Sequence, residues 1–250
     1  MSPTIIASSG ATAAEFLTNG KLRASINLGN PMLAARDGAA SRPTGLSVDL
    51  ADAFARRLGA EVELVVFDAA GKAAEALAQG AVNIGFVAID PKRGAGIRFT
   101  APYLLIEGSY LVHAESSLLT NEQVDRPGIR IAVGRGSAYD LHLERTLRHA
   151  ELVRAPTSPT TVDTFIERGL EVAAGVRQQL EYDATRIPGL RVLDGSFMTI
   201  RQAVGMPRRC SEQAAQLLAA FVEEMKQTGF VAASLARHGI SGAAVAPPEQ

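Results

Sequence analysis

The amino-acid sequence predicts an α/β protein of two similar lobes, each a mostly parallel sheet flanked by helices. In the first half of the chain, short segments rich in β-branched residues alternate with segments of helical period. The alternation begins again after the polar stretch 116–128, which ends in the turn signal Arg126-Pro127-Gly128. A chain of 250 residues is long enough for two such lobes, each with its own core.

The first unit is predicted to place helices between buried strands. Its strands are predicted at 22–26, 61–67 and 82–87, and its helices at 48–58 and 72–79. The first helix carries Leu50, Phe54 and Leu58 on one face, and the second, rich in alanine, stops at Gly80. Helices between buried strands imply parallel pairing with right-handed crossovers, and hence an α/β sheet.

The second unit and the C-terminal segment repeat these signals. Strands are predicted at 129–133, 152–154 and 171–176, and helices at 138–149, 161–168, 210–228 and 230–238. The segment after the last helix contains Pro247-Pro248, and we expect it to fray.

The composition is that of an ordinary soluble globular protein. Hydrophobic residues make up 47% of the chain and charged residues 20%, and the net charge is −1. Because no basic stripe occurs, the sequence does not indicate nucleic acid or a membrane surface as a partner. No segment approaches the roughly 18 apolar residues of a membrane helix. We therefore expect no nucleic-acid binding and no membrane insertion, and we expect a monomer.

Two features bear on the compartment. Cys210 is the only cysteine, so an intrachain disulfide is excluded, and no motif surrounds it. Residues 1–10 lack a basic region and a full apolar region, so they are not a signal peptide as written. Either an export leader was removed, or the native protein is not exported.

Four ordered segments carry a resemblance to a known family. They are Gly45-Leu46-Ser47-Val48-Asp49-Leu50, Ala76-Leu77-Ala78-Gln79-Gly80-Ala81-Val82-Asn83-Ile84-Gly85, Ile97-Arg98-Phe99-Thr100-Ala101-Pro102-Tyr103 and Pro127-Gly128-Ile129-Arg130-Ile131-Ala132-Val133. Together they resemble the type 2 periplasmic binding proteins, specifically the family 3 solute-binding proteins of polar amino acid ABC transporters. The resemblance extends over residues 20–242.

The resemblance implies a venus-flytrap fold, in which the chain leaves lobe 1, builds lobe 2 and returns. We expect lobe 1 at 1–108 and 200–250, lobe 2 at 109–199, and hinge crossings near 103–112 and 195–205. The ligand would lie in the cleft between the closing lobes. The resemblance also implies a periplasmic protein that serves an ABC transporter permease, whereas a native start at Met1 would imply a cytoplasmic one.

The loop after the strand 82–87 is the first candidate ligand site. In the family this loop carries a hydroxyl, a carbonyl and an arginine that binds the ligand's α-carboxylate. Arg93, six residues before Phe99, holds the position of that arginine, whose guanidinium offers two parallel donors. Ala88 lies in the same shortened loop, and Asp90 stands near the missing threonines. Alternatively, Arg93 is a solvated surface arginine.

The turn Gly136-Ser137-Ala138 is the second candidate, at the position where the family uses a Gly-Thr-type turn. Backbone N–H groups and the helix dipole make such a turn an anion site. Ser137 could cap the helix, bind the ligand or do both. A dinucleotide-binding interpretation fails, because Tyr139 stands where a third glycine should be.

The family's ammonium-binding aspartate is missing from its expected position. Five residues after Glu171 comes Val176, followed by Arg177. An ammonium group buried beside Val176 would lose its counter-charge, a loss of several kcal/mol. We therefore expect a ligand without a free α-amino group, and Arg177, if it reaches the cleft, would bind a second acidic group.

The aromatic pair that often encloses the family's ligands is also incomplete. The strand 22–26 leads into Asn27 and Asn30 without an aromatic residue, and the next strand offers only Phe67. The asparagines are candidate donors to a polar ligand, although asparagine and glycine before proline are equally ordinary turn chemistry.

Two other functions stay open. The fold also hosts a dehydratase of the cyclohexadienyl type, in which a cleft carboxylate acts as general acid, and the candidates here are Glu107, Asp90 and Asp68. No motif beyond the fold supports that function. A soluble ligand sensor would need an output module, and the sequence shows no helix-turn-helix segment or membrane anchor.

No cofactor is expected. The four histidines form no metal-binding pattern, and no Gly-x-Ser-x-Gly motif occurs. The sequence therefore predicts a solute-binding protein without catalytic residues, which captures a small anionic solute such as a carboxylate.

Overall fold

The structure is a computed structural model that describes residues 10–38 and 41–249. One sheet runs through it in the order β2-β1-β3-β9-β4-β7-β5-β6, and β8 and β10 each pair with β4. The strands are β1 (Lys21–Asn27), β2 (Glu61–Phe67), β3 (Ile84–Ala88), β4 (Ile97–His113), β5 (Arg130–Gly134), β6 (Glu151–Ala155), β7 (Val172–Val176), β8 (Leu190–Val192), β9 (Met198–Pro207) and β10 (Ala244–Val245). The helices are α1 (Gly10–Ala14), α2 (Leu46–Leu58), α3 (Ala70–Ala78), α4 (Ala138–Thr146), α5 (Thr161–Glu167), α6 (Arg177–Arg186), α7 (Glu212–Gln227) and α8 (Phe230–Arg237).

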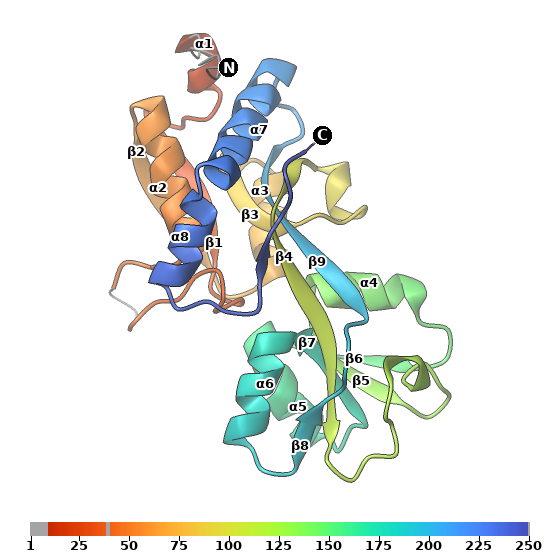
Figure 1. Cartoon of the computed structure of the whole chain (residues 1–250). Helices are drawn as coiled ribbons and strands as arrows, with labels where there is room; N and C mark the ends of the chain where they lie inside the picture. Colours follow the sequence, from red (N-terminus) through yellow and green to blue (C-terminus); the bar gives the residue numbers. More distant parts are fainter. Residues whose placement is uncertain (1–9, 39–40, 250) are drawn as a thin grey trace.

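Two lobes lie at the two ends of this sheet (Figure 1). Lobe 1 holds β1, β2 and β3 with α1, α2, α3, α7 and α8, and lobe 2 holds β5 to β8 with α4, α5 and α6. In lobe 1, β1 pairs in parallel with β2 and β3. In lobe 2, β5 pairs in parallel with β6 and β7. The predicted two-lobed α/β class with parallel pairing is confirmed.

Two long strands join the lobes. β4 is 17 residues long and runs antiparallel to β9, from the pair Ile97↔Pro207 to the pair Gly108↔Met198. At one end β9 pairs with β3, and at the other end β4 pairs with β7 and β8. These strands overlap the predicted crossings, while the lobe boundaries at 108/109 and 199/200 stay a prediction.

Each lobe has an apolar core between its helices and the sheet. In lobe 1, Phe16, Phe54 and Phe221 are buried, with ring centroids 5.0 Å apart for the first two and 4.9 Å for the last two. In lobe 2, Phe165 and Leu180 are buried together. Because Phe54 lies on the face predicted for its helix, α2 packs as the sequence pattern indicates.

Helix α4 is shorter than predicted, because it ends at Thr146 rather than near residue 149. The carboxylate of Asp125 accepts the backbone N–H groups of Arg148, His149 and Ala150 at 2.8 to 3.2 Å. These bonds hold the segment in a non-helical conformation. Such long-range partners cannot be read from local sequence preferences.

The C-terminal tail is docked, so the prediction that it frays is wrong. β10 pairs antiparallel with β4 through Ala244↔Leu105, and the N–H of Ala246 donates to the carbonyl of Tyr103 at 3.1 Å. The Lys226 ammonium group donates to the carbonyl of Pro247 at 3.0 Å. Proline excludes a helix here but is compatible with an extended segment at a sheet edge.

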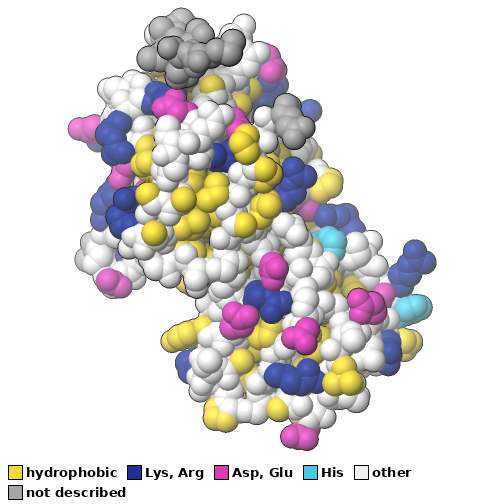
Figure 2. All heavy atoms as spheres, in the orientation of Figure 1, with side chains coloured by type: hydrophobic (Ala, Val, Ile, Leu, Met, Phe, Trp, Pro, Cys, Tyr) yellow, Lys and Arg dark blue, Asp and Glu magenta, His cyan; other side chains and the backbone are white. Residues whose placement is uncertain are grey.

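The surface carries charges of both signs. On the face shown in Figure 2, basic and acidic side chains are interspersed over both lobes. This mixture agrees with the net charge of −1 and forms no single-sign stripe on that face. In the part of the chain that the structure describes, no helix combines the length and the apolar character needed to cross a membrane.

Candidate functional site: the cleft between the lobes

A cavity of about 60 Å³ lies between the two lobes. Both lobes contribute to its walls, including Asn27, Asn30, Ala88 and Arg93 from lobe 1 and Ser137, Ala138 and Val176 from lobe 2. The topology explains why distant sequence segments meet here. β1 ends at Asn27 and β3 ends at Ala88, and the carboxyl ends of parallel neighbours open at the same edge of a sheet.

Arg93 is buried where the lobes meet. It is only 9% exposed, and its guanidinium donates to the carbonyl of Ala88 at 3.1 Å and to that of Gly136, in lobe 2, at 2.9 Å. Burial lowers the pKa of Arg93 to about 10, and the nearby Asp90 carboxylate opposes the shift. The alternative of a solvated surface arginine is therefore wrong. A guanidinium has five N–H donors, so other donors stay available to a ligand.

The turn before α4 brings a helix N-terminus to the cavity. Ser137 caps the helix, because its Oγ accepts the backbone N–H of Asp140 at 3.0 Å. Ser137 and Ala138 both line the cavity. The cap uses an acceptor site of the hydroxyl, and Ser137 also forms a side-chain hydrogen bond with Tyr139. The positive end of the α4 dipole therefore acts on the same space as Arg93.

Gly136 gives this turn its shape. Its φ of 69° lies in the left-handed region that favours glycine, and its N–H donates to the Asp140 carboxylate at 2.8 Å. A Cβ at this position would stand 3.1 Å from the Cα of Gly71 in lobe 1. Gly136 does not line the cavity itself and contributes through the carbonyl that accepts from Arg93.

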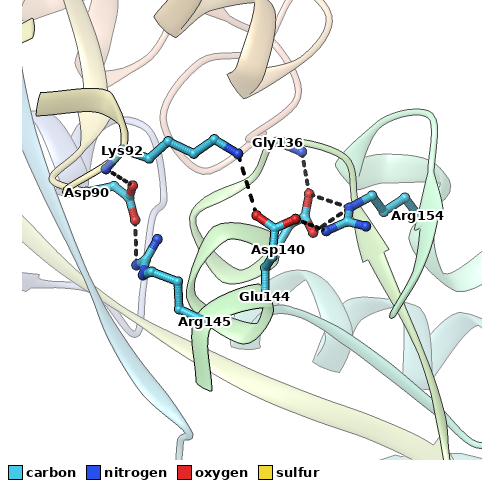
Figure 3. A network of polar contacts seen from close by, with 7 residues as sticks. All are labelled: Asp90, Lys92, Gly136, Asp140, Glu144, Arg145 and Arg154. Atoms are coloured by element: carbon cyan, nitrogen blue, oxygen red, sulfur yellow. Dashed lines mark hydrogen bonds and ion pairs between the residues drawn. The ribbon is translucent and has the colours of Figure 1, made fainter. Parts of the chain in front are cut away.

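Charged side chains connect the lobes beside the cavity (Figure 3). Asp90 of lobe 1 pairs with Arg145 of α4 at 2.7 Å, and Lys92 pairs with Glu144 at 3.5 Å. We call these four residues the cross-lobe latch. Asp90 is only 4% exposed and also accepts the backbone N–H of Lys92 at 2.8 Å. Asp90 therefore joins the lobes instead of lining the cavity, where the sequence analysis expected it.

Two further predicted ligand residues lie outside the cavity wall. Phe67 ends β2, which is the edge strand beyond β1. Arg177 binds Glu107 at 2.6 Å and also donates to the carbonyl of Gly195. These partners hold Arg177 beside the strands that join the lobes. Arg177 therefore does not line the cavity, and its contact with a second acidic group stays a prediction.

The carboxylates considered as general acids also lie outside the wall. Glu107 forms an ion pair with Arg177, and Asp90 forms one with Arg145. Asp68 is exposed and pairs with Lys72 at 2.8 Å, and the hydrogen bond from Lys72 lowers its pKa. A general acid must be within hydrogen-bond reach of its substrate, and none of these three side chains lines the cavity.

Sequence reasoning missed several polar residues of the cavity wall, among them Asp183 on α6 and Gln202 on β9. Asp183 is 5% exposed and is bonded by Gln179 and Arg186, each at 3.2 Å. Helix α6 was not predicted, because only Leu180 and Asp183 are buried along it and the apolar period is weak. The spacing of Gln179 and Asp183 would place both on one helix face, had the helix been recognised.

Two α/β lobes joined by an antiparallel pair of crossing strands, with a cavity between them, define a binding protein of the type 2 periplasmic fold. The chain belongs to the bacterial extracellular solute-binding proteins, family 3, whose family model matches residues 22–239. The resemblance found in the sequence is therefore confirmed.

Solved structures share this fold at low sequence identity. The P235GK mutant of ArgBP from T. maritima is 18% identical with a TM-score of 0.76, covering 91% of this chain and 99% of that one. AncCDT-1, an ancestral amino acid-binding protein and precursor of cyclohexadienyl dehydratase, is 20% identical with a TM-score of 0.75, covering 90% and 98%. AbpA of an amino acid ABC transporter from Streptococcus pneumoniae, bound to L-arginine, is 16% identical with a TM-score of 0.74, covering 88% and 94%. No curated protein matches the chain.

Proposed function

We propose that this protein captures a small carboxylate between its closing lobes and performs no chemistry on it. The observation that carries the proposal is Arg93, a buried cation at the cavity that donates hydrogen bonds to one carbonyl group of each lobe. A carboxylate offers such a guanidinium two parallel acceptors in a space sheltered from water. The helix N-terminus at Ser137 favours the same negative charge from the opposite lobe.

We further propose that the ligand lacks a free α-amino group. Val176 lines the cavity at the position where the family resemblance would place an aspartate. Asp183 also lines it, but its carboxylate is already paired with the guanidinium of Arg186 at 3.2 Å. A buried ammonium group would thus lack a free counter-charge, which costs several kcal/mol.

The setting of the proposed function follows the family. We propose an exported, periplasmic monomer that delivers its ligand to an ABC transporter permease. In the same proposal, lobe 2 at 109–199 moves against the rest of the chain about β4 and β9. Binding energy between ligand and both lobes would drive this closure.

A dehydratase is the second candidate, because AncCDT-1 has the same fold. The positions of Glu107, Asp90 and Asp68 outside the cavity wall favour binding without chemistry. Turnover of prephenate or arogenate by the purified protein, followed by product absorbance, would overturn the non-enzymatic proposal.

Replacing Arg93 with alanine is expected to abolish carboxylate binding while the fold persists. The measurement is the shift in Tm of the protein on adding small carboxylates and their α-amino counterparts. A ligand at about 100 times its Kd stabilises the native state by about 2.7 kcal/mol, so a bound carboxylate is readily detected. Arg93→Ala should lose the whole shift.

The matched control is Arg42→Ala, which removes an exposed lobe 1 arginine that pairs with Asp52 at 2.6 Å. This variant should keep the full shift. An Arg93→Ala protein that still gains the wild-type Tm shift would remove Arg93 from the site. Strong stabilisation by α-amino acids alone would reject the proposed ligand class.

A further inference from the structure

We propose that Gln202 is a specificity residue, which accepts a hydrogen bond from an uncharged donor, a hydroxyl or an amide N–H, on the bound carboxylate. This inference rests on the proposed function and narrows its ligand class. The protein would select carboxylates that carry such a donor over plain aliphatic ones.

The first observation is the position of Gln202 at the cavity. Side chains alternate between the two faces of a strand, and Ile200 and Gln202 of β9 both line the cavity while Arg201 is exposed. Gln202 stands opposite Ala88 of β3, whose carbonyl accepts from Arg93. The amide therefore belongs to the same wall as the carboxylate-binding guanidinium.

The second observation is an unsatisfied acceptor. Gln202 is 7% exposed, and among the described residues no donor reaches its Oε1, which is itself almost fully covered. A buried polar oxygen without a partner destabilises the folded protein. The terminal amide torsion of glutamine is soft, so a small rotation presents this oxygen to a ligand held by Arg93.

The chemistry of the site decides the kind of donor. An amide oxygen accepts hydrogen bonds but carries no net charge, so it cannot replace the counter-ion that an ammonium group needs. A hydroxyl or an amide N–H loses far less hydration free energy on burial than an ammonium group does, and it can donate a hydrogen bond to the oxygen. A site with a buried polar group discriminates strongly against an analogue that leaves the group unpaired.

The test compares three probes of similar size by isothermal titration calorimetry: 4-hydroxybutyrate, succinamate and pentanoate. The wild-type protein should bind at least one of the first two about tenfold or more tightly than pentanoate, and the better of them identifies the donor. Gln202→Met keeps the length of the side chain but removes the acceptor. This variant should lose the preference and bind pentanoate as well as the wild type does.

Arg201→Met is the control, because it changes the next residue on the opposite face of β9 and should keep the preference. The Tm of ligand-free Gln202→Met should equal or exceed that of the wild type, since an unpaired polar group is gone. An unchanged preference in Gln202→Met, equal wild-type affinity for all three probes, or binding of none would overturn the inference. Retained binding by Arg93→Ala would instead count against the proposed function, which separates the two failures.

Discussion

Arg93 is a single side chain that joins the two lobes and also lines the cavity. Its guanidinium bonds carbonyl groups of both lobes, Ala88 and Gly136, and still borders the cavity. With a pKa of about 10 it stays charged at neutral pH despite its burial. The lobes therefore enclose the positive charge of Arg93, which a carboxylate would neutralise. Val176, on the opposite wall, supplies no charge of its own.

At Val176 we expect an introduced acid to change the ligand class. Val176→Asp should bind L-alanine about tenfold or more tightly than the wild type does, because the ammonium group gains a counter-charge. Propionate binding should weaken, since the new carboxylate repels it. Titration calorimetry with both probes measures the change.

Val176 is also the N-cap of α6, where aspartate would stabilise the helix by capping it. Val176→Asn therefore serves as the control, because it caps the helix without adding charge. Equal alanine affinity in the two variants would show that position 176 does not face the ligand's amino group.

At the scale of elements, α2 and α8 are clamped through a single carboxylate. Asp49, in the first turn of α2, accepts from Ser234 at 2.6 Å, Arg237 at 2.8 Å and His238 at 2.9 Å. Burial raises the pKa of Asp49, but these three hydrogen bonds outweigh it and leave the pKa below its ordinary value. The negative charge also lies near the positive end of the α2 dipole.

Asp49→Asn is expected to lower the free energy of unfolding by about 1 to 2 kcal/mol at pH 7, an amount reduced by partial solvent exposure. Because the folded-state pKa is depressed, this stabilisation is fully present above the ordinary carboxyl pKa. It is lost as the pH falls through the folded-state pKa. Urea unfolding of both proteins at pH 7 and near pH 3 should show the difference shrinking in acid.

Asp52→Asn, on the same helix, removes only a surface partner of Arg42 and should change little. A difference between wild type and Asp49→Asn that is equal at both pH values would contradict the carboxylate's role.

The sequence predicts helices and strands correctly where the hydrophobic pattern within one segment determines them. Apolar periodicity located α2 and β2 closely, and the ordered motifs identified the lobes and placed Arg93 and Ser137 at the cleft. Contacts between segments that are distant in the chain could not be predicted from the sequence. The sequence position of Asp90 predicts a ligand residue, whereas its partner is Arg145 of the other lobe. Gln202 reaches the cavity only because β9 lies beside β3.

For the whole molecule, the lobe closure proposed above would depend on contacts that cross the cleft. The cross-lobe latch joins lobe 1 to α4 through a buried carboxylate, Asp90, and a partly exposed arginine, Arg145. Removing one partner of such a pair leaves the other charge uncompensated. In the proposed lobe closure, the latch favours the closed form before any ligand adds its own contacts.

Asp90→Asn is expected to shift the ligand-free protein toward the open form and to weaken carboxylate binding by about tenfold, because the binding-competent closed form is less populated. The asparagine oxygen can still accept the backbone N–H of Lys92, which preserves the turn. Small-angle X-ray scattering should show a larger radius of gyration without ligand and an unchanged one at saturation.

Glu171→Gln is the control, because Glu171 pairs with Arg130 inside lobe 2 at 2.8 Å. It should leave both the radius of gyration and the affinity unchanged. Identical scattering of Asp90→Asn and wild type would show that the latch does not set the opening equilibrium.

The docked C-terminal tail has a consequence for how the protein can be manipulated. The Lys226 side chain is 2% exposed, and its ammonium group is bonded to Glu223, to Pro102 of β4 and to Pro247 of the tail. A truncation before residue 244 would open a water path to this ammonium group and uncover the edge of β4. After pairing with β4 the tail runs to α7 of lobe 1, where the N–H of Glu249 donates to Glu223 at 3.2 Å, so the tether force of a reporter or immobilisation tag attached there would act on lobe 1.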